Sequence, residues 1–268
     1  MGKNNLPALY IPHGGGPCFF MDWTRGPPDT WNRMADWLRS IDGSLPSRPE
    51  ALLVISAHWE ANLPTVTSAA APTLVYDYYG FPPHTYELRW PAPGSPRVAA
   101  RARGLLAAAG LEAREDPERG LDHGVFVPLK VAYPDAQLPT VQLSLRVGLD
   151  PAEHLAIGRA LAPLREEGVL IVGSGMSYHN MRGFMTAPAR EHSARFDAWL
   201  AETITEPAAT RDAHLIEWTS APSARESHPR EEHLLPLMVV AGAAGQDVGA
   251  RVFSDEVMGV VVSAFRFG

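Results

Sequence analysis

The sequence predicts an α/β protein, in which a single domain has a largely parallel central sheet flanked by helices. Three observations support this prediction. Short apolar runs of strand length recur along the chain, amphipathic segments of helix length lie between them, and no long polar linker interrupts the series. The 268 residues fit one large domain, so we expect one domain over residues 1–268.

The expected strands are apolar throughout and do not alternate with polar residues. They are LPALYIP (6–12), ALLVISA (51–57), TVQLSL (140–145), VLIV (169–172) and VMGVVVSAFRF (257–267). Continuous apolar runs are typical of strands that are covered on both faces. The sheet should therefore lie between two layers of helices.

The expected helices alternate with these strands. They cover residues 30–41, 96–109, 151–167, 190–203 and 230–243. The second and third begin near a proline, a common residue of the first helical turn. Residues 72–95 differ, because they are rich in Pro, Tyr and Gly and show no helical period. We expect a long ordered loop there, and such loops are often functional.

The composition excludes several classes of protein. With 46% hydrophobic and 20% charged residues the chain can bury a core, and its net charge of −7 argues against a nucleic-acid surface. Cys18 is the only cysteine, so an intramolecular disulfide and a four-cysteine zinc site are excluded. No apolar run reaches the roughly 20 residues that span a bilayer, and the first residues do not resemble a signal peptide. We expect a cytoplasmic protein without a membrane partner.

Four of the ten histidines stand at or just beyond the ends of expected elements. They are His13 after LYIP, His58 after LLVISA, His123 in LDHG before the apolar VFVPLKV, and His179 in GSGMSYHN after VLIV. In a parallel sheet, His13, His58 and His179 would face one crevice at the carboxyl ends of the strands. Imidazole is the commonest metal ligand and also titrates near neutral pH. A shared metal ion, or acid and base roles, would explain the collection.

Other interpretations of these residues carry less weight. A lone histidine at a strand end is more often structural than a ligand, but four such placements weaken that interpretation. A fifth histidine, His233, has a weaker context near the start of an expected helix. HGGG resembles an oxyanion-hole motif, but no G-x-S-x-G elbow follows it, and we interpret Cys18 as a small buried hydrophobe. The remaining histidines are expected to be surface or structural residues: His84, His154, His192, His214 and His228.

Six segments together resemble the class III extradiol ring-cleaving dioxygenases, in particular the DOPA 4,5-dioxygenase-like branch. They are LYIPHGGGP, VISAHWE, YDYYGFPPHTYELRWPAPGSP, LDHGVFVPLKVAYPDAQLPTVQLSL, GSGMSYHN and REEHLLPLMVVAGAAG. They occur in the family's order and cover nearly the whole chain. HGGGPCFF departs from the HGSP-like sequence usual in that branch, but the histidine, His13, is present.

The resemblance implies a role for each histidine of the motifs. His13, His58 and His233 match the three metal positions, and Glu232 is the second candidate for the third position. His179 matches an acid/base residue, and the resemblance leaves open whether it is also a fourth ligand. His123 matches a second active-site histidine beside the substrate. In the long loop, Tyr78 and Phe81, with Tyr79 and Trp90, are candidates to line the ring pocket, with loop packing an equal alternative.

The activity implied by the resemblance is O2-dependent extradiol cleavage of a catechol-type ring to a ring-opened semialdehyde. Because zinc has no redox chemistry, Fe(II) is expected for activity, even where Zn occupies the purified protein. The expected partners are a small aromatic diol and O2, with a homo-oligomer left open. Two alternatives remain at this point, a zinc-dependent hydrolase on the same fold and a non-catalytic binding protein.

Overall fold

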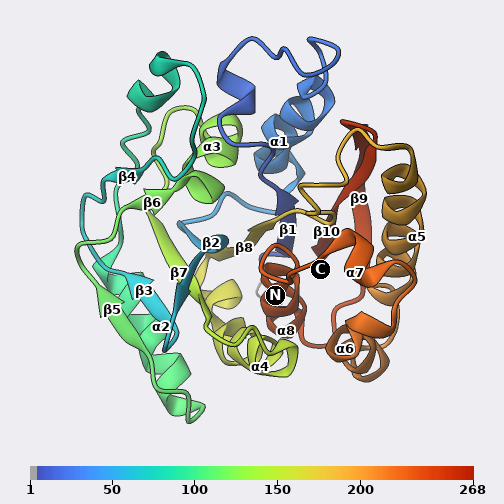
Figure 1. The fold of residues 1–268 in the computed structure, drawn as a ribbon. Coiled ribbons are helices and arrows are strands. Elements are labelled where there is room, and N and C mark those ends of the chain that lie inside the picture. The colour runs from blue at the N-terminus through green and yellow to red at the C-terminus, as the bar shows by residue number, and fades with distance from the viewer. Residues whose placement is uncertain (1–4) are drawn as a thin grey trace.

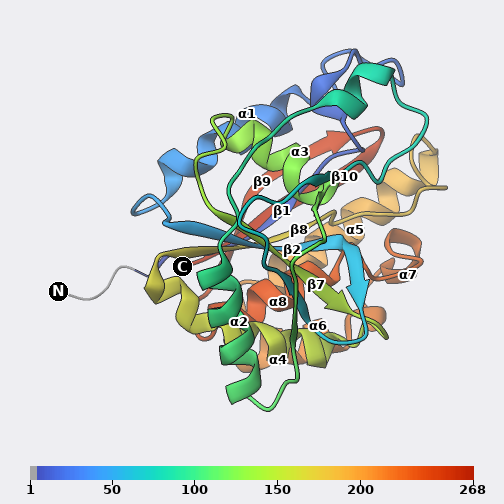
Figure 2. The same ribbon diagram turned by 90° about the vertical axis from the view of Figure 1, so that its left-hand side faces the viewer.

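The computed structural model describes residues 5–268 and shows an eight-stranded sheet between two layers of helices (Figures 1 and 2). The strand order is β5-β3-β7-β2-β8-β1-β10-β9. Its four central strands run parallel and are β7 (Thr140–Arg146), β2 (Ala51–Ala61), β8 (Val169–Gly175) and β1 (Ala8–Pro12). The carboxyl ends of these strands therefore lie at one edge, as the sequence predicts.

The outer strands complete the sheet with mixed directions. They are β3 (Thr65–Thr67), β5 (Arg114–Asp116), β9 (Gly249–Val257) and β10 (Val260–Phe267). Antiparallel pairs join β3 to β7, β10 to β1 and β9 to β10, while β5 lies parallel to β3. A second small sheet pairs β4 (Leu74–Val75) with β6 (Leu121–Asp122).

Each face of the sheet has its own apolar core. Alternate residues of β1 point to opposite faces, so that Leu9 and Ile11 join one core while Ala8 and Tyr10 join the other. The first core is covered by α1 (Asn32–Ser44) and α3 (His123–Ala132). The second is covered mainly by α2 (Pro96–Ala108), α4 (Pro151–Leu161) and α8 (Leu235–Ala244) (Figure 2).

The remaining helices lie near the C-terminal strands or in loops. They are α5 (Ala187–Thr203), α6 (Ala208–Ile216), α7 (Ala224–Ser227) and the short 3-10 helices η1 (Cys18–Phe20), η2 (Pro83–Glu87), η3 (Ala162–Glu167) and η4 (Trp218–Ser220). No helix within residues 5–268 is long and apolar enough to cross a membrane.

The predicted α/β class is confirmed, and the differences lie at element boundaries and in short elements that were not expected. The expected strand 257–267 is the second arm of a hairpin, because Met258 and Gly259 both have positive φ (51° and 76°) and turn the chain. The first arm, β9, was missed because it mixes polar and apolar residues and only its two end residues are buried. The expected helix 230–243 begins only at Leu235, and the expected helix 151–167 changes to a 3-10 helix after Leu161.

The contact between α4 and α8 offers a test of the packing. A Cβ atom on Gly158 would lie 2.0 Å from the carbonyl oxygen of Val239, so the two helix backbones touch there. We expect Gly158→Ala to lower the free energy of unfolding by about 1–3 kcal/mol, the usual cost of overpacking, as measured by urea denaturation. The control is Gly104→Ala on α2, where a Cβ meets open space. It should stabilise by about 0.5–1 kcal/mol; equal effects of both substitutions would contradict this description of the contact.

Candidate metal centre

Five histidines meet at the carboxyl edge of the sheet, and they arrive from five separate segments. His13 follows β1, His179 lies in the loop after β8, and His123 is the first residue of α3. His233 lies just before α8. His58 lies within β2 and not after it, because the strand continues to Ala61. The pairing of β2 with β7 is irregular between Ile55 and Glu60, and such a bulge re-aims a side chain.

The three histidines expected to be metal ligands surround a common point. The ring centroids of His13 and His58 are 4.9 Å apart, those of His58 and His233 are 4.9 Å apart, and those of His13 and His233 are 5.2 Å apart. The Nε2 atoms of His13 and His58 approach to 3.2 Å. The structure therefore brings these three side chains together, although they are far apart in sequence.

The other two imidazoles adjoin this triangle. The ring of His123 lies 4.0 Å from that of His58, and the ring of His179 stacks on that of His233 at 3.3 Å. Two sets of three side chains have ligand atoms that all lie within 4.8 Å of one another. They are His13, His58 and His123, and His179, Glu232 and His233. The cluster thus offers more ligand atoms than one ion requires.

Glu232 holds two of the imidazoles from outside the cluster. Its Oε1 atom lies 2.9 Å from Nδ1 of His233 and 3.3 Å from Nδ1 of His179. In a neutral imidazole whose Nδ1–H donates to this carboxylate, the Nε2 atom keeps its lone pair. Arg230 lies 3.5 Å from the other carboxylate oxygen of Glu232. A carboxylate that orients a ligating histidine in this way is common in metal sites.

Asp77 holds a further imidazole of the cluster, that of His123, through its Nδ1 atom. Its Oδ1 atom accepts hydrogen bonds from the backbone N–H of His123 at 2.9 Å and from Nδ1 of the same residue at 2.8 Å. Its Oδ2 atom lies 3.6 Å from Nδ1 of His58. Sequence reasoning missed Asp77, although it is the only acidic residue in the aromatic part of the long loop, residues 72–86.

His13 is held by a hydroxyl group in place of a carboxylate. Ser174 Oγ lies 3.3 Å from Nδ1 of His13 and donates its single proton to the carbonyl oxygen of Gly124. The hydroxyl must therefore accept the Nδ1–H of His13. With this contact, all five imidazoles have a polar group behind Nδ1.

A second polar layer supports the strand that carries His58. The backbone N–H of His58 donates to Ser56 Oγ at 3.2 Å, and Ser56 Oγ donates to Asp122 at 2.7 Å. Asp122 also accepts from Gln142 on the neighbouring strand, and burial raises the pKa of this carboxyl. Its hydrogen bonds offset part of the cost of burying it.

Burial keeps the central imidazoles neutral. It lowers the pKa of His13 and His233 well below the usual range, and the neighbouring imidazoles lower both further. Burial and the adjacent His123 lower the pKa of His58 to about 3, against the opposing effect of Asp77. Neutral imidazoles keep the lone pair that a metal ion needs.

One nitrogen atom of the cluster lacks a bonding partner, and a metal ion would supply one. Nε2 of His233 is buried and has no hydrogen-bond partner among the residues that the structure describes. A buried polar atom without a partner is costly. The neutral, convergent donor set and this unpaired nitrogen therefore fit a divalent transition metal.

A cavity of about 270 Å³ opens onto the five imidazoles. Tyr78 and Phe81 line it, and so does Tyr79. Trp90 does not line it, because its ring is buried and its Nε1–H donates to the carbonyl oxygen of Tyr133. The other wall residues were not predicted to line the pocket, and they come from distant segments. They are Trp23, Arg25, Trp31, Met181, Phe184 and Met258, together with Gly14–Gly16.

The five histidines expected to be surface or structural residues lie outside this cavity lining. His154 and His228 are fully buried and bonded to backbone, the first by accepting from Arg146 N at 3.1 Å and the second through Ser177 O at 3.0 Å. These contacts support a structural role for both side chains.

Comparisons of this chain with known proteins all point to one family. Residues 7–266 match the family described as the catalytic LigB subunit of aromatic ring-opening dioxygenase. The chain is 41% identical to a 4,5-DOPA dioxygenase extradiol of Beta vulgaris, over 97% of this chain and 96% of that protein. It is 33% identical to a protein of the same name from Escherichia coli K12, over 91% of this chain and 87% of that one.

Two further proteins are similar to nearly the whole of this chain. A dioxygenase named tasH from Hapsidospora irregularis is 39% identical over 98% of this chain and 85% of its own length. The crystal structure of the uncharacterized protein JW3007 from Escherichia coli K12 superposes with a TM-score of 0.78 at 30% identity, over 98% of this chain and 100% of that one.

A substitution can show whether Glu232 positions the imidazole of His233 or itself binds the metal. We expect Glu232→Gln to weaken metal binding by about 10- to 100-fold, because it loosens the imidazole of His233 without removing a metal bond. Calorimetric titration with Zn(II) measures this change. The control is Glu231→Gln, which alters the neighbouring carboxylate paired with Arg225 at 2.6 Å and should leave metal affinity unchanged. Complete loss of binding at saturating metal would instead make Glu232 a ligand.

Proposed function

The chain belongs to the family of the catalytic LigB subunit of aromatic ring-opening dioxygenases and is a metal-dependent extradiol dioxygenase; we propose that the histidine cluster is its catalytic centre. The observation that carries this proposal is the inward convergence of neutral imidazole nitrogens, one of them buried and unpaired. We propose further that residues 1–268 act as one catalytic unit, because the cluster draws on both β1 and the segment before α8.

The proposed metal ligands are the Nε2 atoms of His13, His58 and His233. Their ring centroids form a nearly equilateral triangle, with sides of 4.9, 4.9 and 5.2 Å. Fe(II) would supply redox coupling between a bound catechol and O2, which zinc cannot supply. We therefore propose Fe(II) as the active metal and expect zinc to bind the same imidazoles without supporting ring cleavage.

His179 is the proposed general base and acid. Its Nδ1 atom faces Glu232, so its Nε2 lone pair is free to take a proton from a ring hydroxyl. The side chain lines the cavity and stacks on the proposed ligand His233, so it would lie near the hydroxyl of a diol bound to the metal. The same nitrogen can later return the proton to the product. Such positioned proton transfers contribute about 10²–10⁴-fold to a rate.

The remaining groups orient the ring and exclude water. His123 is fixed by Asp77 and offers its Nε2 atom to the substrate. Tyr78 lies edge-on to His123 and to Phe81, with ring centroids 5.6 and 5.5 Å apart, and its hydroxyl donates to the carbonyl oxygen of Thr85. These rings form a rigid apolar wall that suits an aromatic ring. The proposed substrate class is thus a small catechol-type diol.

Anaerobic loading with Fe(II), followed by a catechol and air, tests this function. We expect O2 uptake and a coloured ring-opened product with Fe(II), and no uptake with Zn(II). Hydrolysis of esters or amides by the zinc form, without O2 uptake by the iron form, would favour a zinc hydrolase. Absence of both activities would leave a binding protein and contradict the proposal.

Two substitutions distinguish the residue proposed to bind the metal, His58, from the residue proposed to transfer protons, His179. His58→Ala should abolish metal retention, because it removes a ligand. His179→Ala should retain metal and lower the rate of O2 uptake by about 10²-fold or more. The control is His214→Ala, which removes an exposed imidazole paired with Glu206 at 2.7 Å and should change neither quantity. Full metal content in the His58 variant would contradict the ligand assignment.

A further inference from the structure

We propose that His228 is a positioning residue, which fixes the loop that carries the proposed general base His179. The inference rests on the proposed function, because it bears on catalysis only if His179 moves a proton. The loop covers residues 176–186 and joins β8 to α5. His228 follows α7 directly and is not among the described residues that line the cavity. It therefore acts on the reaction through the loop and does not touch a substrate.

One hydrogen bond joins the side chain of His228 to this loop. Its Nε2 atom lies 3.0 Å from the carbonyl oxygen of Ser177. A carbonyl oxygen can only accept, so Nε2 carries the proton and donates it. The hydroxyl oxygen of Ser177 accepts from the backbone N–H of Ser263 on β10 at 2.8 Å. Ser177, two residues before the proposed base, is thus held between His228 and the sheet.

Two further hydrogen bonds continue this connection along the loop. The backbone N–H of His179 donates to the carbonyl oxygen of Ser227 at 3.0 Å. The side-chain amide of Asn180 donates to the carbonyl oxygen of Glu226 at 2.8 Å. In these two bonds the supporting segment offers its backbone, whereas in the first it offers a side chain. That first bond is thus the one that a substitution in the supporting segment can remove.

The surroundings of His228 keep its imidazole neutral. The ring lies edge-on to those of Phe196 and Trp218, with centroids 5.3 and 6.1 Å away. Burial lowers the pKa of His228 to about 3, against the opposing effect of the Ser177 carbonyl. A neutral imidazole has a single N–H group. The only proton of this ring is therefore committed to the loop.

Packing alone does not explain a histidine at this position. Nδ1 of His228 is buried and has no hydrogen-bond partner among the residues that the structure describes. Such an atom is costly, and an apolar side chain between the two aromatic rings would avoid the cost. His154 is equally buried, but both of its ring nitrogens have partners. What a histidine supplies at position 228 is therefore the bond from Nε2 to the loop.

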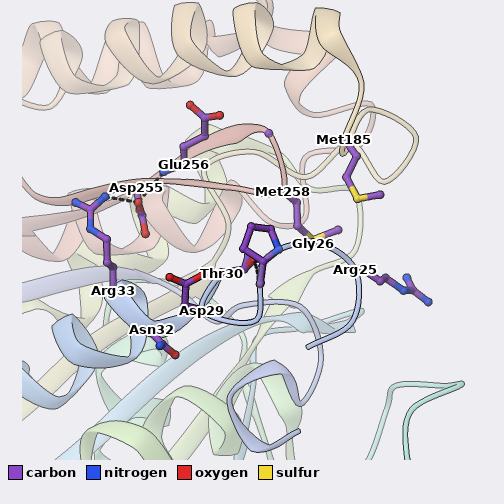
Figure 3. A pocket seen from close by; sticks show the side chains of 12 residues that line it. Arg25, Gly26, Asp29, Thr30, Asn32, Arg33, Met185, Asp255, Glu256 and Met258 are labelled. Atoms are coloured by element: carbon purple, nitrogen blue, oxygen red, sulfur yellow. Dashed lines mark hydrogen bonds and ion pairs between the residues drawn. The ribbon is translucent and has the colours of Figure 1, made fainter. Parts of the chain in front are cut away.

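The far part of the loop offers the proposed base less support. Residues 176–178 are buried, whereas residues 181–182 are exposed, and His179 lies between them. Beyond the exposed part, the backbone N–H of Met185 donates to the carbonyl oxygen of Met258 at 2.8 Å. Both side chains line a hollow of about 510 Å³, which Figure 3 shows and which shares Met258 with the lining of the cavity. Support for the base therefore comes from the buried side, where residue 228 lies.

Substitutions of His228 in the Fe(II)-loaded protein test the inference. His228→Leu removes the donor, and we expect kcat per bound iron to fall by about 10-fold, the factor that one buried hydrogen bond can supply. The KM for a catechol and the metal content should change little, because the bond supports the base and no metal ligand. His228→Gln should restore most of kcat, since its side-chain amide can donate from a similar position.

His154→Leu is the matched control, because it removes an equally buried imidazole that is bonded to backbone near α4. It should lower the free energy of unfolding and leave kcat per bound iron unchanged. Equal falls of kcat in the two Leu variants, or no recovery in His228→Gln, would overturn the inference and leave His228 a stabilising residue only.

Hydrogen exchange of the Zn(II)-loaded proteins decides the inference without any turnover. In His228→Leu the amides of residues 177–180 should exchange about 10-fold faster, because the loop opens more often; in His228→Gln and His154→Leu they should not. Unchanged exchange in His228→Leu would contradict the inference. The expected exchange, with no ring cleavage by the wild-type protein, would contradict the proposed function alone. If His228→Leu does not fold, His228→Asn replaces it, since its amide is too short to reach Ser177.

Discussion

Five imidazoles can share one small space in this protein because each is held from behind through its Nδ1 atom. Glu232 holds His179 and His233, Asp77 holds His123 and approaches His58, and Ser174 Oγ accepts from the fifth imidazole. The Nε2 atoms then face inward as acceptors. Were these imidazoles protonated they would repel one another, and burial prevents protonation by lowering the pKa of the central ones.

The fold brings these groups together by close contact between backbones. A Cβ atom on Gly124 would lie 2.5 Å from Ser56 Oγ, so α3 approaches β2 only because this residue is glycine. A Cβ atom on Gly175 would lie 2.1 Å from the carbonyl oxygen of His233, which fixes the end of β8 against the segment before α8. The same segment is tied to β1, where the hydroxyl of Tyr10 donates to the carbonyl oxygen of His233 at 2.7 Å. The geometry of the centre therefore depends on the core beneath it.

Sequence patterns predicted the parallel strands and the histidines at their ends, since continuous apolar runs and the following polar residue are local features. They did not predict the bulge that turns His58 inward within β2, because a change of register depends on the partner strand. The roles of Asp77 and Ser174 were not predicted either. An acid in a loop and a serine in a strand show no special role in the sequence, because the imidazole that each contacts is brought to it only by the fold. The wall residues Trp23 and Arg25 come from a segment with no periodic pattern, and only the folded chain places them at the cavity.

The position of the metal ion in the Fe(II)-loaded protein tests the central claim most directly. A crystal structure at high resolution should show one ion at about 2.0–2.2 Å from Nε2 of His13, His58 and His233, with Glu232 and Asp77 still bonded to Nδ1 atoms. An ion bound through an Nδ1 atom, or coordinated by Glu232 in place of His233, would contradict the account.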